Sequence, residues 1–185
     1  MDKALLDALD ILEKEGVILT PTETVVGISC SAKASKQIER IFKIKQRSSL
    51  KAFIVLVDSV EMIKNYSRNI SKKEIAFLIS KEPTTVILNN ITNLPKNLIA
   101  KDGTLAFRIT KHPELKKIIT KLAHPLVSTS ANISGEKAPL IIKEVNKSIL
   151  EAVDYSLILQ SNYKPSSKPS RIVKVKGSEV EIIRP

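Results

Sequence analysis

The stretch "PTETVVGISCSA" occupies residues 21–32, and it begins with a proline and three polar residues before it becomes a run of small, mostly apolar side chains. It follows "VILT" (17–20), whose apolar character predicts a short buried strand. Loops that follow strands are where α/β proteins place their ligand sites. Two hydroxyls and a carboxylate are more than a simple turn requires, so this stretch raises the question of what they hold.

Helical and extended patterns alternate along the rest of the chain. Helices are indicated by apolar residues at helical spacing, by a capping box at Ser71 and Glu74, and by Pro113, which suits a first helical turn. The predicted helices cover residues 2–15 (ending at Gly16), 35–47, 71–80, 113–123 and 141–151. The predicted strands cover residues 17–20, 52–57, 84–88, 104–109, 125–129, 155–159, 171–175 and 180–184.

This order of elements predicts an α/β fold. With 185 residues, of which 43% are hydrophobic, the chain can bury one core, and no repeat divides it. We therefore expect a single domain over residues 1–185, with a mixed sheet that is partly antiparallel towards its C-terminal end. The segment 160–170 is rich in Ser, Pro and Lys and is predicted to be a flexible loop.

Composition excludes several classes of protein. One cysteine cannot form a disulfide framework within the chain, and one cysteine with two histidines cannot build a structural zinc site. Cys30 lies in an apolar run and is interpreted as a small core residue. No segment resembles a signal peptide, and no apolar run is long enough to span a bilayer. We expect a cytoplasmic protein that does not partner a membrane.

The charge of the chain favours anionic partners. The 30 Lys and Arg exceed the 19 Asp and Glu by 11, which suits nucleic acid, nucleotides or an anionic membrane. A lysine-rich surface without a specific partner explains the same excess. Four Phe, three Tyr and no Trp leave few rings for stacking on bases. Charge alone therefore leaves both interpretations open.

Common nucleotide and hydrolase motifs are absent. The sequence contains neither G-x-x-x-x-G-K-[ST] nor G-x-G-x-x-G, and no Ser-His-Asp or Cys-His set is evident. His112, directly before Pro113, is interpreted as a helix-start residue rather than a catalyst. Polar side chains gather instead in "KIKQR" (43–47) and "PLVSTSANISGEKAP" (125–139). Taken singly, the first is explained by the helix dipole and the second by a turn or helix cap.

Together, these three stretches resemble one family. "PTETVVGISCSA" is similar to the P-T-[DE]-[TA]-x-x-G opening of the YrdC/Sua5 family of threonylcarbamoyl-AMP synthases, "KQR" to its K-x-R element and "STSANISG" to its S-x-N element. "TLAFRITKHP", "KPSRIV" and the closing "IIRP" are similar to further elements of the family. The resemblance extends from about Leu5 to Pro185, and the order and spacing of the elements make it specific.

The resemblance implies a YrdC-like fold, with a twisted mixed β-sheet flanked by helices and a positively charged concave face. It also implies the site residues, with no residue assigned to a metal. The signature residues, expected to be catalytic, are Lys45, Arg47, Ser130 and Asn132. Those expected to bind ATP are Arg47, Lys51, Thr104, Ser130, Asn132 and Arg184. Those expected to face threonine are Thr24, Arg108, Ser128 and Ser170.

The end of the chain at Pro185 resembles the short bacterial, TsaC-like form, whereas a longer branch of the family carries a linker and a further domain. Three positions depart from the longer branch: Val26 replaces a common aromatic, Leu56 a threonine-contacting histidine and Ala52 a proline. "KQR", "RITKHP" and "PLVSTSAN" are close to the short form. We interpret the departures as differences between branches.

The activity implied by the resemblance joins L-threonine, bicarbonate or CO2, and ATP into threonylcarbamoyl-AMP and pyrophosphate. This is the first step in making N6-threonylcarbamoyladenosine in tRNA. Mg2+ is expected with ATP. Implied partners are the proteins that complete the transfer (TsaD/TsaB/TsaE-like) and tRNA itself, through the basic surface. A reaction that crowds anions together needs positive charge and positioned donors, which agrees with the residue types above.

Arg184 is the most unusual of these residues because it is next to the C-terminus, where fraying is common. We predict that the strand before it is ordered, that Val180 and Ile182 anchor this strand, and that Arg184 closes over the nucleotide. Two other functions stay open for the chain. One is an RNA-binding or ribosome-maturation module, and the other is a carbamoyl-transfer domain of the hydrogenase-maturation type.

Overall fold

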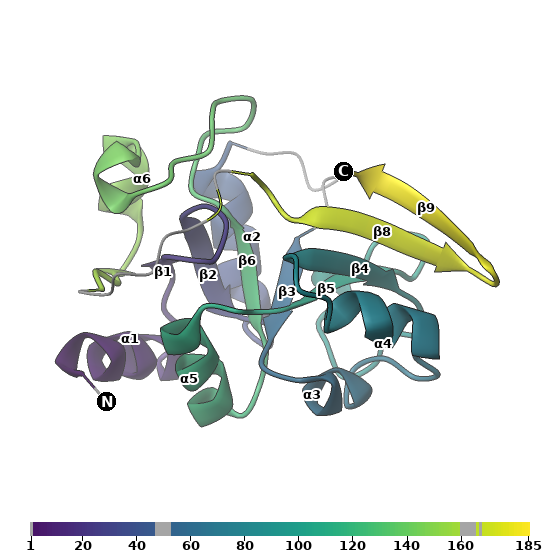
Figure 1. Cartoon of the computed structure of the whole chain (residues 1–185). Helices are drawn as coiled ribbons and strands as arrows, with labels where there is room; N and C mark the ends of the chain where they lie inside the picture. The colour runs from purple at the N-terminus through teal and green to yellow at the C-terminus, as the bar shows by residue number, and fades with distance from the viewer. Residues whose placement is uncertain (1, 47–52, 160–165, 167) are drawn as a thin grey trace.

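The computed structural model describes residues 2–46, 53–159, 166 and 168–185. Within these residues, nine strands form one mixed sheet in the spatial order β7-β1-β2-β6-β3-β5-β4-β8-β9 (Figure 1). Their bounds are β1 Ile18–Thr20, β2 Gly27–Ser31, β3 Ile54–Val57, β4 Thr84–Leu88, β5 Leu105–Ile109, β6 Leu126–Ser130, β7 Tyr155–Ser156, β8 Arg171–Lys176 and β9 Glu179–Arg184. The predicted α/β fold is confirmed.

The strand directions are mixed across the sheet. β1 is parallel to β7, β3 to β5 and β4 to β8, whereas the other neighbouring pairs are antiparallel. The last two strands form a hairpin, and their antiparallel pairing agrees with the prediction that the sheet is partly antiparallel towards its C-terminal end. Because this hairpin adds to β4, it brings the C-terminal residues beside the middle of the chain (Figure 1).

Helices connect the strands. Those in the described part of the chain are α1 Lys3–Glu13, α2 Ser35–Ile44, α3 Val60–Lys64, α4 Lys72–Leu78, α5 Pro113–Leu122 and α6 Lys147–Ala152, with short 3-10 turns η1 Lys96–Leu98 and η2 Ile142–Glu144. The predicted capping box of α4 is present, since Ser71 and Glu74 each accept a hydrogen bond from the other's backbone N–H. α5 begins at Pro113 with His112 in the N-cap position, as predicted.

One face of the sheet is buried against a large apolar cluster. Successive residues of a strand point to opposite faces, so Val55 and Val57 of β3 lie on this face while Leu56 lies on the other. The cluster also takes buried residues from four helices: Ile38 and Ile41 of α2, Ile63 of α3, Leu78 of α4 and Ile149 of α6. The predicted core residue Cys30 is fully buried here.

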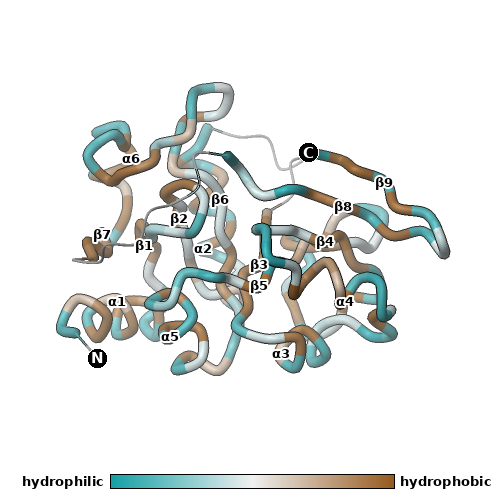
Figure 2. The backbone as a smooth tube through the Cα atoms, viewed as in Figure 1, coloured by the Kyte–Doolittle hydropathy of each residue, from teal (hydrophilic) through white to brown (hydrophobic). Residues whose placement is uncertain are grey.

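The opposite face is covered only in part. At one end, α1 and α5 lie side by side, and each carries both hydrophobic and hydrophilic residues (Figure 2). Their apolar residues pack on Ile18, Leu56 and Leu126 of the strands. Farther along the same face the strands present polar side chains instead, among them Ser128 and Arg108. This uncovered polar part of the sheet positions the candidate site.

Several local predictions are wrong. The range 141–151 is not one helix, since η2 and α6 are separated by Val145 and Asn146. Strand β2 was not predicted, because its small, partly polar residues do not show a strand pattern. The short helix α3 was also missed.

α1 ends at Glu13, close to the end predicted at Gly16. The residue with a left-handed backbone conformation between them is Glu15, with φ 57°. A Cβ at Gly16 would lie 2.4 Å from Ile11 Cγ2, so the glycine is needed for close approach of the chain to α1.

No helix within the described residues is long and apolar enough to cross a membrane.

Candidate functional site

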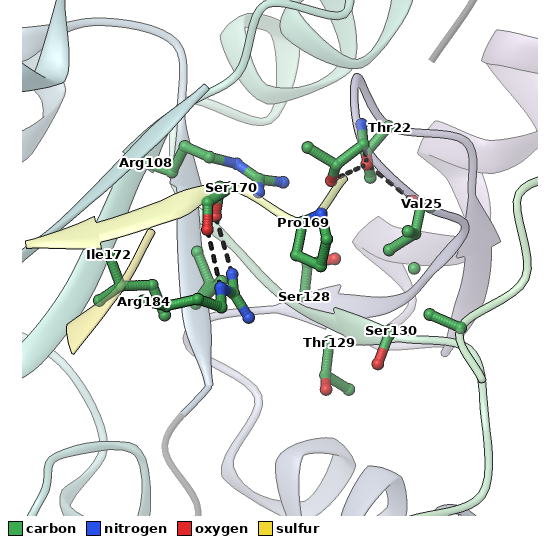
Figure 3. Close-up of a pocket in the computed structure, with 14 residues that line it drawn as sticks. Thr22, Val25, Arg108, Ser128, Thr129, Ser130, Pro169, Ser170, Ile172 and Arg184 are labelled. Carbon is green, nitrogen blue, oxygen red and sulfur yellow. Dashed lines mark hydrogen bonds between the residues drawn. The ribbon is translucent and has the colours of Figure 1, made fainter. Parts of the chain in front are cut away.

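A cavity of about 290 Å³ opens on the polar part of the sheet. The residues that line it are Thr22, Thr24, Val25, Gly27, Ile54, Arg108, Ser128, Thr129, Ser130, Ala138, Pro169, Ser170, Ile172 and Arg184 (Figure 3). They come from the β1–β2 turn, from strands β2, β3, β5, β6, β8 and β9, and from the segments after β6 and before β8. All four residues expected to face threonine are in this lining, together with Ser130 and Arg184 of the expected ATP set. Their individual roles stay predictions.

The β1–β2 turn forms one wall of the cavity. Thr22 and Thr24 are buried, their hydroxyl oxygens lie 3.1 Å apart, and Thr22 donates a hydrogen bond of 2.7 Å to the carbonyl of Val25. A Cβ at Gly27 would lie 2.5 Å from the Ser128 hydroxyl. The absence of a side chain at Gly27 therefore lets β2 lie close against Ser128.

A row of buried hydroxyls supports Ser128. The Thr20 and Ser29 hydroxyl oxygens lie 2.8 Å apart, and Ser29 donates to Ser128 Oγ at 3.1 Å. The three residues belong to the adjacent strands β1, β2 and β6. Since Ser128 accepts this hydrogen bond, its own proton can be donated to a ligand in the cavity.

Arg108 brings a buried positive charge into the cavity. Its side chain is 6% exposed, and its Nε lies 2.8 Å from Oε1 of Glu23, whose side chain is 1% exposed. The Nε–H is not directed at that oxygen, so the contact is ionic rather than a hydrogen bond. Thr110 donates a hydrogen bond of 3.0 Å to the other carboxylate oxygen of Glu23. The guanidinium extends towards the cavity (Figure 3).

Arg184 is aimed at the same cavity by a β-bulge. Ile172 pairs with Arg184 and Val173 pairs with Ile182, so Ile183 is the extra residue of β9. A bulge shifts the alternation of side chains, and here it places Arg184 on the face that carries Arg108. The predicted position of Arg184 in a formed strand is confirmed.

Hydrogen bonds to Ser170 hold the Arg184 side chain in place. Arg184 Nε donates to the Ser170 carbonyl at 2.8 Å, and Nη2 donates to the Ser170 hydroxyl at 3.1 Å. The Ser170 hydroxyl also lies 2.9 Å from that of Thr85. Burial lowers the pKa of Arg184, and the positive charge of Arg108 lowers it further. Two guanidiniums in one cavity favour an anionic ligand.

Only one of the two residues predicted to anchor β9 is confirmed. Val180 packs against the large apolar cluster, as expected. Ile182 is 60% exposed, so its predicted anchoring role is wrong. Ile182 lies on the same edge strand but belongs to neither apolar cluster of the described chain.

Lys45 and Asn132 meet beside the cavity without lining it. The buried Lys45 ammonium donates to the Ser130 carbonyl and, at 2.7 Å, to the Asn132 carbonyl. The Asn132 side-chain oxygen accepts from the Ser130 hydroxyl, and its Nδ2 donates to the Glu136 carbonyl at 2.6 Å. These bonds tie the end of α2 to the loop after β6. Three of the four signature residues are thus brought together.

Other expected site residues are not brought to the cavity. Arg47 and Lys51, like the departure at Ala52, lie outside the described residues. Thr104 does not line the cavity, and its hydroxyl donates to Asp102 Oδ1 at 2.7 Å. The role of Thr104 in ATP binding stays a prediction. Leu56 lies under α1 and α5 rather than in the cavity.

The sequence did not single out every residue that shapes the site. Ile54, Ile172 and Pro169 form apolar parts of the wall. Apolar strand residues carry no signal that separates a cavity wall from a core. Glu23 was also missed as an individual site residue, although its place between two threonines in the opening stretch is a signal.

The described residues offer little to a metal ion. Among them, no three His, Cys, Asp or Glu side chains gather into a metal-binding group. Among the described residues, the cavity lining contains hydroxyls and guanidiniums but no carboxylate.

Comparison with known sequences identifies the family. A sequence model named Sua5_yciO_yrdC, described as "Telomere recombination", matches residues 10–185. The chain belongs to the Sua5/YciO/YrdC family. One relative in this family is the threonylcarbamoyl-AMP synthase of Psychromonas ingrahamii, 31% identical over 172 residues that cover 91% of this chain and 90% of the relative. The enzyme of the same name from Pseudoalteromonas translucida is 33% identical over 166 residues, covering 86% and 89%.

Solved structures of the Sua5/YciO/YrdC family share the fold. Escherichia coli YciO has a TM-score of 0.83 at 22% identity, covering 97% of this chain and 87% of YciO. P. abyssi Sua5 complexed with L-threonine has a TM-score of 0.84 at 21% identity, covering 98% of this chain. The chain spans 53% of that Sua5 protein. The predicted family fold is confirmed, while the positive charge of its concave face as a whole stays a prediction.

Proposed function

We propose that this member of the Sua5/YciO/YrdC family is a threonylcarbamoyl-AMP synthase. Two relatives that carry this name match most of the chain, and each is matched over most of its own length. The observation that carries the proposal is the cavity in which Arg108 and Arg184 face a group of serine and threonine hydroxyls. This lining suits small, polar, anionic substrates.

The proposed reaction has two steps. The amine of L-threonine attacks CO2, supplied as such or by dehydration of bicarbonate, and releases a proton to become a carbamate. A carbamate oxygen then attacks the α-phosphorus of ATP, the bond from that phosphorus to the bridging oxygen of the β-phosphate breaks, and pyrophosphate leaves. The carboxylate, the carbamate and the triphosphate are all negative. The site must therefore supply positive charge and fixed donors more than a strong acid or base.

Arg108 is proposed to bind the threonine end of this assembly. A guanidinium binds a carboxylate through two parallel hydrogen bonds, which fixes both the position and the orientation of the substrate. The hydroxyls of Thr24, Ser128 and Ser170 line the same cavity and can bind the remaining polar groups of threonine. The structure of P. abyssi Sua5 with L-threonine supports this ligand class.

Arg184 and Ser130 are proposed to bind the nucleotide end. Arg184 supplies positive charge from β9, and Ser130 supplies a hydroxyl from the end of β6. Lys45 and Asn132 would hold Ser130 and the loop after β6 in position through the hydrogen bonds described above. Arg47, Lys51 and Thr104 remain proposed ATP ligands on the resemblance alone.

Magnesium is proposed to enter with ATP. The cavity lining of the described residues offers no carboxylate, so the phosphate oxygens of ATP would be the main ligands of the ion. When bound, Mg2+ would share the charge of the triphosphate. The two arginines would act on the charge that remains.

The wider setting is part of the same proposal. The product would be used in the cytoplasm by TsaD/TsaB/TsaE-like transfer proteins to make N6-threonylcarbamoyladenosine in tRNA. Direct contact with tRNA through the basic surface is proposed from the excess of 11 positive charges.

The proposal is tested by pyrophosphate release. We expect release from ATP only when L-threonine and bicarbonate are both present, with each omitted in turn as the control. Equal release with L-serine, or without any amino acid, would contradict the threonine assignment. An RNA-binding module would release none, and a requirement for carbamoyl phosphate in place of threonine and bicarbonate would favour a carbamoyl-transfer domain.

A further inference from the structure

Glu23 lies directly behind the cavity wall. It is 2% exposed and stands between Thr22 and Thr24, which both line the cavity. Its carboxylate does not line the cavity, yet one of its oxygens is 2.8 Å from Arg108 Nε. A buried carboxylate has a large desolvation cost, so its position against this arginine requires an explanation.

We infer that Glu23 is a positioning residue, which sets the orientation of the Arg108 guanidinium for the carboxylate of the amino-acid substrate. The inference rests on the proposed function and deepens it. Glu23 acts through Arg108 and does not touch the substrate.

The geometry of the pair supports this role. Glu23 approaches Arg108 at Nε, so the two Nη groups are left for a ligand, and no hydrogen bond joins them to another described residue. Those two groups form one edge of the planar guanidinium, and a carboxylate can accept from both at once. Because Glu23 Oε1 and Arg108 Nε–H are close but not aligned, charge rather than a directed hydrogen bond holds the pair together.

Glu23 is itself fixed from two directions. Thr110 of the segment after β5 donates to Glu23 Oε2 at 3.0 Å, and the backbone N–H of Ser166 donates to the Glu23 carbonyl at 2.8 Å. Arg108 lies in β5, and Thr110, which orients Glu23, directly follows the same strand. A small shift of Glu23 would therefore be passed directly to the guanidinium.

The charge of Glu23 also sets the electrostatic balance of the cavity. Arg108 and Arg184 are the charged side chains of its described lining, and they repel each other. Glu23 neutralises one of these two charges before any ligand is present. The pairing lowers the free-energy cost of burying Arg108.

A purely structural ion pair would explain the same distance, so the test must separate the two roles. The Glu23→Gln variant keeps the shape of the side chain and removes its charge. We expect the Kd for L-threonine to rise about 10-fold or more, as for loss of one charge-assisted interaction, while the Kd for ATP changes less than about 2-fold. Unchanged threonine affinity in a folded Glu23→Gln protein would overturn the inference.

A double-mutant cycle shows whether Glu23 acts through Arg108. In the Arg108→Ala background, Glu23→Gln should cause no further rise in the threonine Kd, because the oriented group is already gone. A structural residue would weaken binding by the same factor in both backgrounds, and that result would overturn the inference.

Two further variants complete the design. Thr110→Val removes the hydrogen bond to Glu23 and should raise the threonine Kd about 3-fold, which decides the matter if Glu23→Gln does not fold. Asp154→Asn is the matched control, since Asp154 forms an ion pair of 2.6 Å with Arg40 outside the cavity. It should lower the melting temperature without changing the threonine Kd.

Wild-type protein that binds no threonine would contradict the proposed function. Normal binding by the wild type, with unchanged threonine Kd values for Thr110→Val and Glu23→Gln, would contradict this inference alone.

Discussion

The two ends of one sheet face differ in what lies above them. At the covered end, Ile18, Leu56 and Leu126 are buried beneath α1 and α5. At the cavity end, Ser128 and Arg108 lie on the same face but line a cavity. Leu56 and Arg108 are even register partners on adjacent strands. Strand β6 contributes to both ends, with Leu126 at the covered end and Ser128 at the cavity, and the helices α1 and α5 cover only the first of them.

Within one face of the sheet, the covered end therefore contributes to stability and the cavity end to ligand binding. Burial of the apolar residues under the helices stabilises the fold, because their surface is removed from water. The polar residues of the cavity remain available to a ligand. The Ser128 position shows how close the two regions are, since Leu126 is two residues earlier on β6. Substitutions at the two ends should therefore change different measured quantities.

The largest effect is expected from making the cavity end resemble the covered end. Arg108→Leu removes both Nη donors from the site and leaves Glu23 without its partner. Two charge-assisted hydrogen bonds contribute about 3–6 kcal/mol, so threonine-dependent pyrophosphate release should fall about 100-fold or more. Steady-state release of pyrophosphate measures this. Activity within about 10-fold of wild type would show that Arg108 does not bind the substrate.

The next effect concerns the covered end. Ile118 of α5 is fully buried there, so Ile118→Ala should lower the free energy of unfolding by about 2–5 kcal/mol. The threonine Kd of the folded protein should stay the same. Denaturant unfolding and equilibrium binding measure the two quantities, and a large change in Kd would mean that the two ends are coupled.

A smaller effect is expected from truncation after Ile183. Arg184 donates to Ser170 and adds charge to the cavity, but β9 keeps its other pairings with β8. ATP affinity should fall several-fold while the melting temperature hardly changes, since one charged group is lost and no core residue. Removal of Pro185 alone is the matched control and should leave both unchanged. Equal ATP affinity for the two truncated proteins would reduce Arg184 to a surface charge.

The smallest effect is a pH dependence at the junction between the two ends, where β5 leads into α5. Burial lowers the pKa of His112 from its ordinary value of 6.5, and the charges of Glu114 and Glu23 oppose this shift. The unfolded chain therefore binds a proton at acidic pH that the folded chain resists. The free energy of unfolding should be fully retained above pH 6.5 and should decrease as the pH falls below that value.

The His112→Asn variant should show a shallower decrease of unfolding free energy between about pH 7 and 5. Some decrease should remain, because burial also lowers the pKa of His124. Chemical denaturation at a series of pH values measures the slopes. Identical slopes for the variant and the wild type would contradict the assignment to His112.

Much of the architecture was predictable from local patterns. The capping box of α4, Pro113 at the start of α5 and the antiparallel pairing at the C-terminal end of the sheet were all confirmed, because each depends on residues close in sequence. Strand β2 was not predictable in the same way. Its polar residues Ser29 and Ser31 are buried only because other strands surround them. Local pattern cannot reveal a strand whose burial is created by distant segments.

The sequence alone determined the residue types of the site, because order and spacing of short motifs are properties of the chain. Through the family resemblance, it assigned Thr24, Arg108, Ser128 and Ser170 to threonine and Arg184 to ATP. Only the tertiary structure decided that these five line one cavity and that Lys45 and Asn132 stand beside it.

The tertiary structure alone also assigned a partner to Glu23 and a face to Arg184. Glu23 and Arg108 are far apart in the sequence, and their contact exists because the β1–β2 turn lies against the end of β5. The direction of Arg184 depends on one unpaired residue in the register of β8 and β9. Register and long-range contact are set by how the whole sheet packs, which no short stretch of sequence contains.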